Sequence, residues 1–322
     1  CLLGLGLGSS DLFLWDEVFY GSRAVVAGYG GSWLDQSQTA VGGAWTGFHP
    51  PLVIWMMALA GRVAGFEEWT LRAPIVLTGM AAVVVLRSFV LRLTHSPRAA
   101  LCAGLALALT PLFTCYARRW QLGVPVVFWI TLSLFGFQRA LWGRSRWSLL
   151  SGVALGLALL SKLAVGILAP LSIAVFLVWE ALAGSRAVAR RGLRLLAALS
   201  VLGVAIAAPW YVAMTMRYGG LYWERAFGLH AVTRLTHVVE GHSTALGVFY
   251  YPLQAVVWMV TLAPFVVLGM KRAALGSLAG DERRFLWSWL LTPFILFSLS
   301  ASRTSTYLLI FLPPLATFAG LG

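Results

Sequence analysis

Carboxylates are scarce in this chain, and they gather near its beginning. Only eleven occur in 322 residues, and four of them lie between Asp11 and Pro51. Asp16 and Glu17 follow an apolar segment, where a carboxylate is costly unless it faces water or a polar cavity. An acid in such a cleft can act as a general base or hold a metal ion. The alternative is a helix start, where acids favour the positive end of the dipole, but this does not explain their position after an apolar segment.

Histidines share the two longest polar stretches, residues 11–51 and 215–246. Four of the five lie there: His49, His230, His237 and His242. Histidine is a common metal ligand and becomes a cation below its pKa. His49 precedes two prolines, which could equally hold it extended as an ordinary loop residue. The sequence leaves both interpretations of His49 open.

Several basic residues stand at the ends of apolar runs. Arg118, Arg119, Arg234 and Arg303 carry the guanidinium fork that suits a phosphate, although arginines also reach from apolar surfaces to the membrane interface. Lys162 separates two apolar runs and has glycine and proline nearby. This spacing predicts a tight hairpin with the ammonium group facing a polar cavity, whereas the alternative is a lysine at a plain helix end.

The elements that must position these residues are membrane helices. Sixty per cent of the residues are hydrophobic and 11% are charged, against about 25% charged in soluble domains. We therefore predict an all-α, multi-pass membrane protein with one domain over residues 1–322. Apolar runs of spanning length cover residues 73–91, 99–116, 123–138, 163–179, 195–214, 247–270, 285–301 and 304–321, and a shorter run, 147–161, ends at Lys162. Residues 1–9 resemble the end of a truncated first span, which brings the expected total to about ten.

Residues 52–64 are apolar but too short to cross a bilayer, so we place them as an interfacial helix in the first loop. With this assignment, one side of the membrane receives fourteen basic and three acidic loop residues, and the other receives ten and eight. The positive-inside rule puts the first side in the cytoplasm. The acids and histidines then share the extracytoplasmic face.

Other function classes lack their signals. The net charge of +13 marks the cytoplasmic loops of a membrane protein rather than a nucleic-acid partner. The sequence has no glycine-rich nucleotide loop, no GxSxG and no CxxC. Its three cysteines offer no disulfide framework.

With these residues in view, the chain resembles the integral-membrane GT-C glycosyltransferases related to protein O-mannosyltransferases and to the aminoarabinose transferases of lipid A, a glycosyltransferase family 39-like group. The resemblance covers nearly the whole chain. In order, the matching stretches are Asp16-Glu17-x-x-Tyr20, Gly47-Phe48-His49-Pro50-Pro51-Leu52, Leu71-Arg72-Ala73-Pro74, Ala117-Arg118-Arg119, Gly156-x-x-x-x-Ser161-Lys162, Pro209-Trp210-Tyr211 and Ser302-Arg303.

The resemblance implies sugar transfer from a polyprenyl-phosphate donor to a lipid, glycan or protein acceptor. It places the active site at the extracytoplasmic face of a cell membrane, here a bacterial inner membrane. Asp16 matches the family's essential first-loop acid, with Glu17 beside it. A divalent metal ion is the one cofactor we consider, with Asp16 and His49 as ligands. The implied substrate contacts are Tyr20, His49 and His230, and the implied phosphate contacts are Arg118, Arg119, Lys162, Arg234 and Arg303.

Two departures from the family pattern bear on activity. His49 stands where relatives commonly have a lysine, and Gly123 stands where they have a second acid. The chain also ends soon after Pro313-Pro314, whereas relatives continue. The alternatives to an enzyme are therefore a catalytically inactive homologue and a transporter of lipid-linked sugars. A transporter is expected to hold polar sites near the middle of the membrane, and the polar residues here gather at one face.

Overall fold

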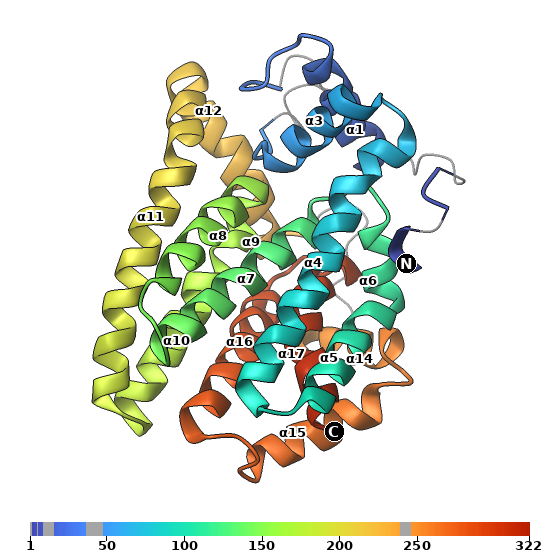
Figure 1. Ribbon diagram of the computed structural model, residues 1–322. Coiled ribbons are helices and arrows are strands. Elements are labelled where there is room, and N and C mark those ends of the chain that lie inside the picture. The colour runs from blue at the N-terminus through green and yellow to red at the C-terminus, as the bar shows by residue number, and fades with distance from the viewer. Residues whose placement is uncertain (1, 5, 9–15, 37–47, 239–245) are drawn as a thin grey trace.

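The computed structural model describes residues 2–4, 6–8, 16–36, 48–238 and 246–322, and no β-strand occurs among them. Long helices run side by side through most of the molecule, and the short helices α1 and α3 lie together at one end (Figure 1). α1 covers Asp16–Gly28 and α3 covers Leu52–Ala64. The thirteen-residue α3 is too short to span a bilayer, as the sequence predicts. The described part of residues 1–9 includes one short 3₁₀ helix, η1 (Leu2–Gly4).

Within the residues that the structure describes, four segments are long and apolar enough to cross a membrane. They are α4 (Glu68–Thr94), α7 (Gly123–Leu141), the segment Leu163–Ala183 and α11 (Arg186–Tyr218). Two bent helix pairs raise the number to six if each pair counts as one span. The chain is a multi-pass membrane protein, and the total of about ten spans stays a prediction.

Two apolar runs that look continuous in the sequence are broken in the structure. α5 (Pro97–Leu109) and α6 (Pro111–Ala117) meet at 64°, and the segments Gly247–Trp258 and Ala263–Ala274 meet at 119°. Each break is followed by a proline in the first turn of the next helix. Proline has no N–H to donate and disfavours helical geometry in the residue before it. The run 247–270, which the sequence predicts as a spanning segment, therefore consists of two segments bent against each other.

The remaining described helices complete the bundle and the segments at its ends. They are α8 (Trp147–Ser161), α9 (Leu163–Gly166), α10 (Leu168–Ala183), α12 (Gly220–Trp223), the π-helix η2 (Glu224–Val232), α13 (Thr233–Thr236), η3 (Gly247–Phe249), α14 (Tyr250–Trp258), α15 (Ala263–Ala274), α16 (Gly280–Leu299), the 3₁₀ helix η4 (Ser305–Ile310) and α17 (Leu312–Leu321).

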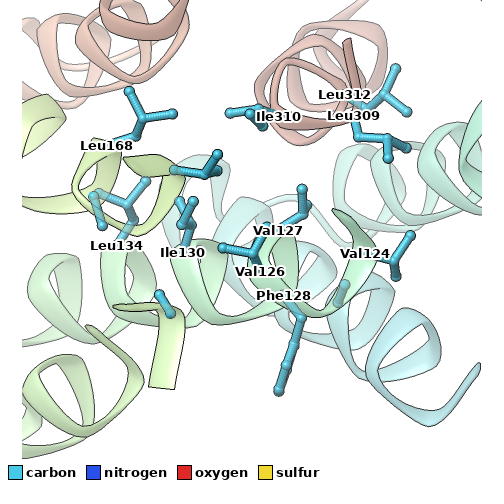
Figure 2. Packing of buried hydrophobic residues seen from close by; sticks show 14 of the residues in the cluster. Val124, Val126, Val127, Phe128, Ile130, Leu134, Leu168, Leu309, Ile310 and Leu312 are labelled. Atoms are coloured by element: carbon cyan, nitrogen blue, oxygen red, sulfur yellow. The ribbon is translucent and has the colours of Figure 1, made fainter. Parts of the chain in front are cut away.

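α7 lies at the centre of the packing. Its apolar side chains, including Val127 and Ile130, face Leu168 at the start of α10 and Leu309 of η4 (Figure 2). α8 packs against α7 on one side and α11 on the other. Glycines 152 and 156 of α8 allow this close approach, since a Cβ at either would lie within 3 Å of α11 side chains. Small residues four apart are a common contact surface between membrane helices.

The basic loops meet at the end of the bundle away from α1 and α3 (Figure 1). The guanidinium of Arg92 donates to the carbonyl of Trp142, and the indole N–H of Trp142 donates to Asp281. Arg284 donates through two nitrogens to the buried carboxylate of Glu180. The loops that the charge count assigned to the cytoplasm therefore form one face, opposite the acidic first loop.

Candidate active site

α1 carries the two predicted acids at its first turn, where they face different surroundings. The side chain of Asp16 is exposed, whereas that of Glu17 is 1% exposed. Both carboxylates lie at the positive end of the helix dipole. Only Asp16 is open to an incoming substrate.

Glu17 forms a buried ion pair. Arg72 of α4 donates from Nε to Oε1 at 3.2 Å and from Nη2 to Oε2 at 3.1 Å. The backbone N–H of Trp120 donates to Oε1 at 3.0 Å. The ring of Trp120 also occupies the place of a Cβ at Gly21, at 2.2 Å. Glu17 therefore fixes α1 against α4 and the 118–122 segment, which sets the position of Asp16.

A second side of α1 carries Tyr20 and Arg23, and His49 lies against it. The rings of Tyr20 and His49 meet edge to face with centroids 5.7 Å apart, so two of the predicted substrate contacts lie together. The guanidinium carbon of Arg23 lies 5.7 Å from the centre of the Tyr20 ring. Arg23 is fully buried, and none of its three side-chain nitrogens has a hydrogen-bond partner. Burial lowers the pKa of Arg23 to about 10.

Three separate parts of the chain bring basic residues to η4. The hydroxyl of Tyr116 contacts that of Thr306 at 3.3 Å, which ties the segment carrying Arg118 and Arg119 to η4. Lys162 lies with Nζ 5.6 Å from the centre of the Tyr307 ring. Arg303 precedes η4 and donates to the carbonyl of Ser298 at 2.8 Å. We call the four half-buried residues Arg118, Arg119, Lys162 and Arg303 the basic cluster.

Lys162 occupies a break in the helical path. Its backbone is extended, with φ −161° and ψ 98°, between the end of α8 and the start of α9. The predicted hairpin with the ammonium group of Lys162 in a polar cavity stays a prediction. The helix η2, which includes His230, packs against α9. The side chains of His230 and Arg234 lie outside the described part of the chain.

The acids and the basic cluster are neighbours. Trp120, whose N–H binds Glu17, directly follows Arg119 in the chain. The carbonyls of Gly6 and Leu7 accept from Arg118 and Arg72, respectively. Short backbone paths therefore connect the α1 ion pair with the basic cluster.

An apolar cavity of about 310 Å³ lies beside η4, between α14, α15, α16 and α17. Its lining includes Tyr251, Met259, Phe294 and Phe311. Three aromatic rings connect it to the basic cluster. Tyr251 lies 6.2 Å from Phe297, and Phe297 stacks on Tyr307 at 4.8 Å, between ring centroids. Tyr307 in turn contacts Lys162.

Gly123, where the family resemblance leads us to expect a second acid, begins α7. A Cβ at this position would lie 2.8 Å from the Leu309 side chain, so an acid here would require Leu309 to move. Within the described residues, no three His, Cys, Asp or Glu side chains form a metal-binding group. Because these residues do not assemble a donor set, we derive no reaction step that uses a metal ion.

Arg23, Arg72 and Trp120 are the residues of this region to which sequence reasoning assigned no role. The available signal for Arg72 was a charge beside an apolar run, which requires a partner. For Arg23, the signal was its spacing of seven residues from Asp16, which places both on one helix face.

Comparisons with known proteins agree on the fold and family. The family model for dolichyl-phosphate-mannose-protein mannosyltransferases matches residues 48–212. An undecaprenyl phosphate-alpha-4-amino-4-deoxy-L-arabinose arabinosyl transferase of Pseudomonas aeruginosa strain LESB58 is 31% identical over 98% of this chain and 56% of its own length. The homologous transferase of strain PAO1 is 30% identical over the same shares. The chain thus spans about half the length of these curated relatives.

Solved structures show the same architecture. ArnT from Cupriavidus metallidurans, bound to undecaprenyl phosphate, matches with a TM-score of 0.84 and 21% identity, over 99% of this chain and 57% of that one. The oligosaccharyltransferase AglB from Archaeoglobus fulgidus, in complex with an inhibitory peptide and a dolichol-phosphate, matches with a TM-score of 0.65 and 17% identity, over 99% and 48%. At these identities the likeness concerns the fold. The chain has the GT-C fold and belongs to the dolichyl-phosphate-mannose-protein mannosyltransferase family.

Proposed function

We propose that this chain transfers a sugar from a polyprenyl-phosphate donor to a lipid, glycan or protein acceptor. The observation that carries the proposal is the basic cluster at η4, joined by aromatic rings to an apolar cavity. Its relatives are named for undecaprenyl phosphate and 4-amino-4-deoxy-L-arabinose. We therefore take an undecaprenyl-phosphate-linked aminopentose as the donor to test first.

The two halves of this site suit the two halves of such a donor. Arginine and lysine neutralise a phosphate and donate charged hydrogen bonds to its oxygens. The cavity, at about 310 Å³, lies within the usual size range of ligand pockets, about 300–1,000 Å³. Its almost wholly apolar lining offers a favourable environment to part of a polyprenyl chain.

Asp16 supplies the general base in this proposal. The acceptor oxygen attacks the anomeric carbon of the sugar, and the bond from that carbon to the phosphate oxygen breaks. The electron pair leaves with the phosphate, and the acceptor proton passes to Asp16. The donor phosphodiester becomes a phosphomonoester with additional negative charge, which the basic cluster stabilises. Glu17, paired with Arg72, holds α1 so that Asp16 keeps its place.

The charge distribution supports an extracytoplasmic site in a bacterial inner membrane. The basic loops around Arg92, Glu180 and Arg284 form the face opposite α1, and basic loops stay in the cytoplasm. A variant without native cysteines tests this orientation. With an impermeant thiol reagent in intact cells, Tyr29→Cys in the first loop should react, and Leu275→Cys between α15 and α16 should not. Both side chains are exposed, at 76% and 87%. The reverse labelling pattern would overturn the orientation.

The central test measures transfer by the purified protein in proteoliposomes. Wild type is supplied with an undecaprenyl-phosphate-linked aminopentose and lipid A, and release of undecaprenyl phosphate is followed together with sugar on the acceptor. We expect both products in equal amounts. A variant in which Arg118, Arg119, Lys162 and Arg303 are all replaced by glutamine should lose donor binding. Binding of the donor without release or transfer by wild type would instead support an inactive homologue.

A further inference from the structure

Arg23 is a buried cation whose partner is missing from the described chain. Its side chain is 0% exposed, and Nε, Nη1 and Nη2 all lack hydrogen-bond partners. Although burial lowers its pKa to about 10, Arg23 stays charged at neutral pH. A buried charge without a counterion is strongly unfavourable. An anion bound beside the guanidinium of Arg23 would compensate its buried charge.

Helix geometry directs Arg23 toward the candidate base. Asp16, Tyr20 and Arg23 stand at positions i, i+4 and i+7 of α1, so they share one face. Asp16 and Arg23 are about 10 Å apart along the helix axis. Helical side chains lean toward the N-terminus, and the guanidinium of Arg23 indeed lies over the ring of Tyr20, three residues earlier. The cation therefore points back along the helix toward Asp16.

The surroundings provide the rest of an anion site. Tyr20 stands between Arg23 and the half-buried His49, with each in contact with its ring. A guanidinium presents its donors in a plane, which matches two oxygens of a phosphate. The basic cluster at η4 is a separate group of residues and belongs to other helices.

We propose that Arg23 binds a phosphate-type oxyanion of a substrate on the Asp16 face of α1, beside Tyr20. The inference rests on the proposed function, because the transfer reaction supplies two sources of such a group. One is the phosphate of the polyprenyl donor, and the other is a phosphate on the acceptor. In either case Arg23 places the anion-bearing substrate near the base.

The experiment compares Arg23→Met and Arg23→Lys with wild type in detergent. Arg62 is the matched control, because it also lies over an aromatic ring of the first loop, 5.8 Å from the centre of Trp33, but is exposed. Thermal unfolding is measured without ligand, with inorganic phosphate and with undecaprenyl phosphate. Transfer kinetics at saturating donor then give KM and kcat for lipid A.

Without ligand, Arg23→Met should unfold at or above the wild-type temperature, because the substitution removes an unpaired buried charge. It should weaken either undecaprenyl phosphate binding or the KM for lipid A by about tenfold or more, the effect of losing a hydrogen bond to a charged group. Arg23→Lys should lie between Arg23→Met and wild type, and Arg62→Met should match wild type. The affected measurement identifies the donor or the acceptor as the source of the anion.

Two results would overturn the proposal. The first is a markedly lower unfolding temperature, or no folded protein, for Arg23→Met without ligand, which would give Arg23 a purely structural role. The second is unchanged phosphate response, donor binding and acceptor KM in a folded Arg23→Met. Failure of the proposed function looks different. Wild type would then bind inorganic phosphate through Arg23, with the response lost in Arg23→Met, but neither bind undecaprenyl phosphate nor transfer sugar.

Discussion

The two edges of the buried face of α1 hold arginines in opposite states. At one edge, Arg72 reaches over from α4 and forms two hydrogen bonds with Glu17, which also accepts from the Trp120 backbone. At the other edge, Arg23 is just as deeply buried but lacks any hydrogen-bond partner in the described chain. Only the first arrangement is electrostatically complete within the protein.

This difference indicates that the Glu17–Arg72 pair has a structural role, whereas the charge of Arg23 has a functional one. The other two buried carboxylates in the described residues are also paired: Asp35 with Arg217, and Glu180, at the far end of the bundle, with Arg284. The chain thus neutralises its buried acids internally where helices have to be joined. A buried cation left unpaired beside a candidate base costs stability, and functional sites are where such costs are retained.

Removal of the Asp16 charge should have the largest effect on activity. Asp16→Asn keeps the side-chain size, and loss of a general base typically lowers the rate about 10²–10⁴-fold. Unfolding temperature should be unchanged, because Asp16 is exposed. The measurement is transfer from a polyprenyl-phosphate sugar at matched protein levels, with Glu67→Gln as a control for an exposed acid nearby. A rate loss of less than about threefold would remove Asp16 from the role of base.

Breaking the Glu17–Arg72 pair should have the largest effect on stability. Glu17→Gln leaves Arg72 buried without its counterion, which costs about 3–5 kcal/mol in unfolding free energy. The double variant Glu17→Met with Arg72→Met should recover much of this loss, because an apolar replacement of a buried pair is often neutral. Thermal unfolding of Glu17→Met, Arg72→Met and the double variant gives the coupling energy between the two side chains. If the double variant is no more stable than either single one, the pair is not the source of the effect.

Substitutions in the basic cluster should have smaller effects on donor binding. Arg303→Lys keeps the charge but loses the bidentate fork. Loss of one charged hydrogen bond, about 1.5 kcal/mol, corresponds to roughly tenfold in affinity. We expect this loss in at least one of the Arg→Lys variants at positions 118, 119, 234 and 303, by titration with undecaprenyl phosphate. Unchanged affinity and rate in all four Arg→Ala variants and in Lys162→Ala would exclude both the basic cluster and Arg234 from phosphate binding.

The helices were largely predictable from hydrophobicity, but their breaks were not. Residues 123–138 and 195–214 indeed form α7 and α11. Pro74 and Pro209 lie inside long helices, whereas Pro111 and Pro264 each follow a break in the chain. A proline is tolerated inside a membrane helix when neighbouring groups satisfy the freed carbonyl. This depends on packing, which a single sequence does not contain.

Less of the candidate site could be predicted, for the same reason. The family resemblance implies Tyr20 and His49 as substrate contacts, and nothing in the sequence predicts that their rings meet. The different fates of Arg23 and Arg72 could not be predicted. Glu17 and Arg72 are 55 residues apart, so their pairing depends on how α1 packs on α4. Only the folded structure shows that Arg72, and not Arg23, pairs with Glu17.

The smallest expected effect comes from Glu68, and it tests whether Glu17 is the acid that neutralises Arg72. Arg72 also approaches Glu68, four residues earlier on α4, with Nη1 3.9 Å from Oε2. The side chain of Glu68 is 39% exposed, so solvent screens its attraction to Arg72, and a pair with such an exposed acid contributes about 0.2–1 kcal/mol. Glu68→Gln should therefore lower the unfolding free energy by less than about 1 kcal/mol, and the loss should shrink in high salt. Measured beside Glu17→Gln, it removes an acid from the same arginine while leaving the buried pair intact. Equal losses in the two variants would mean that Arg72 is neutralised by a diffuse group of acids. In that case the contrast between the paired Arg72 of α4 and the unpaired Arg23 of α1 would no longer identify Arg23 as a ligand-binding residue.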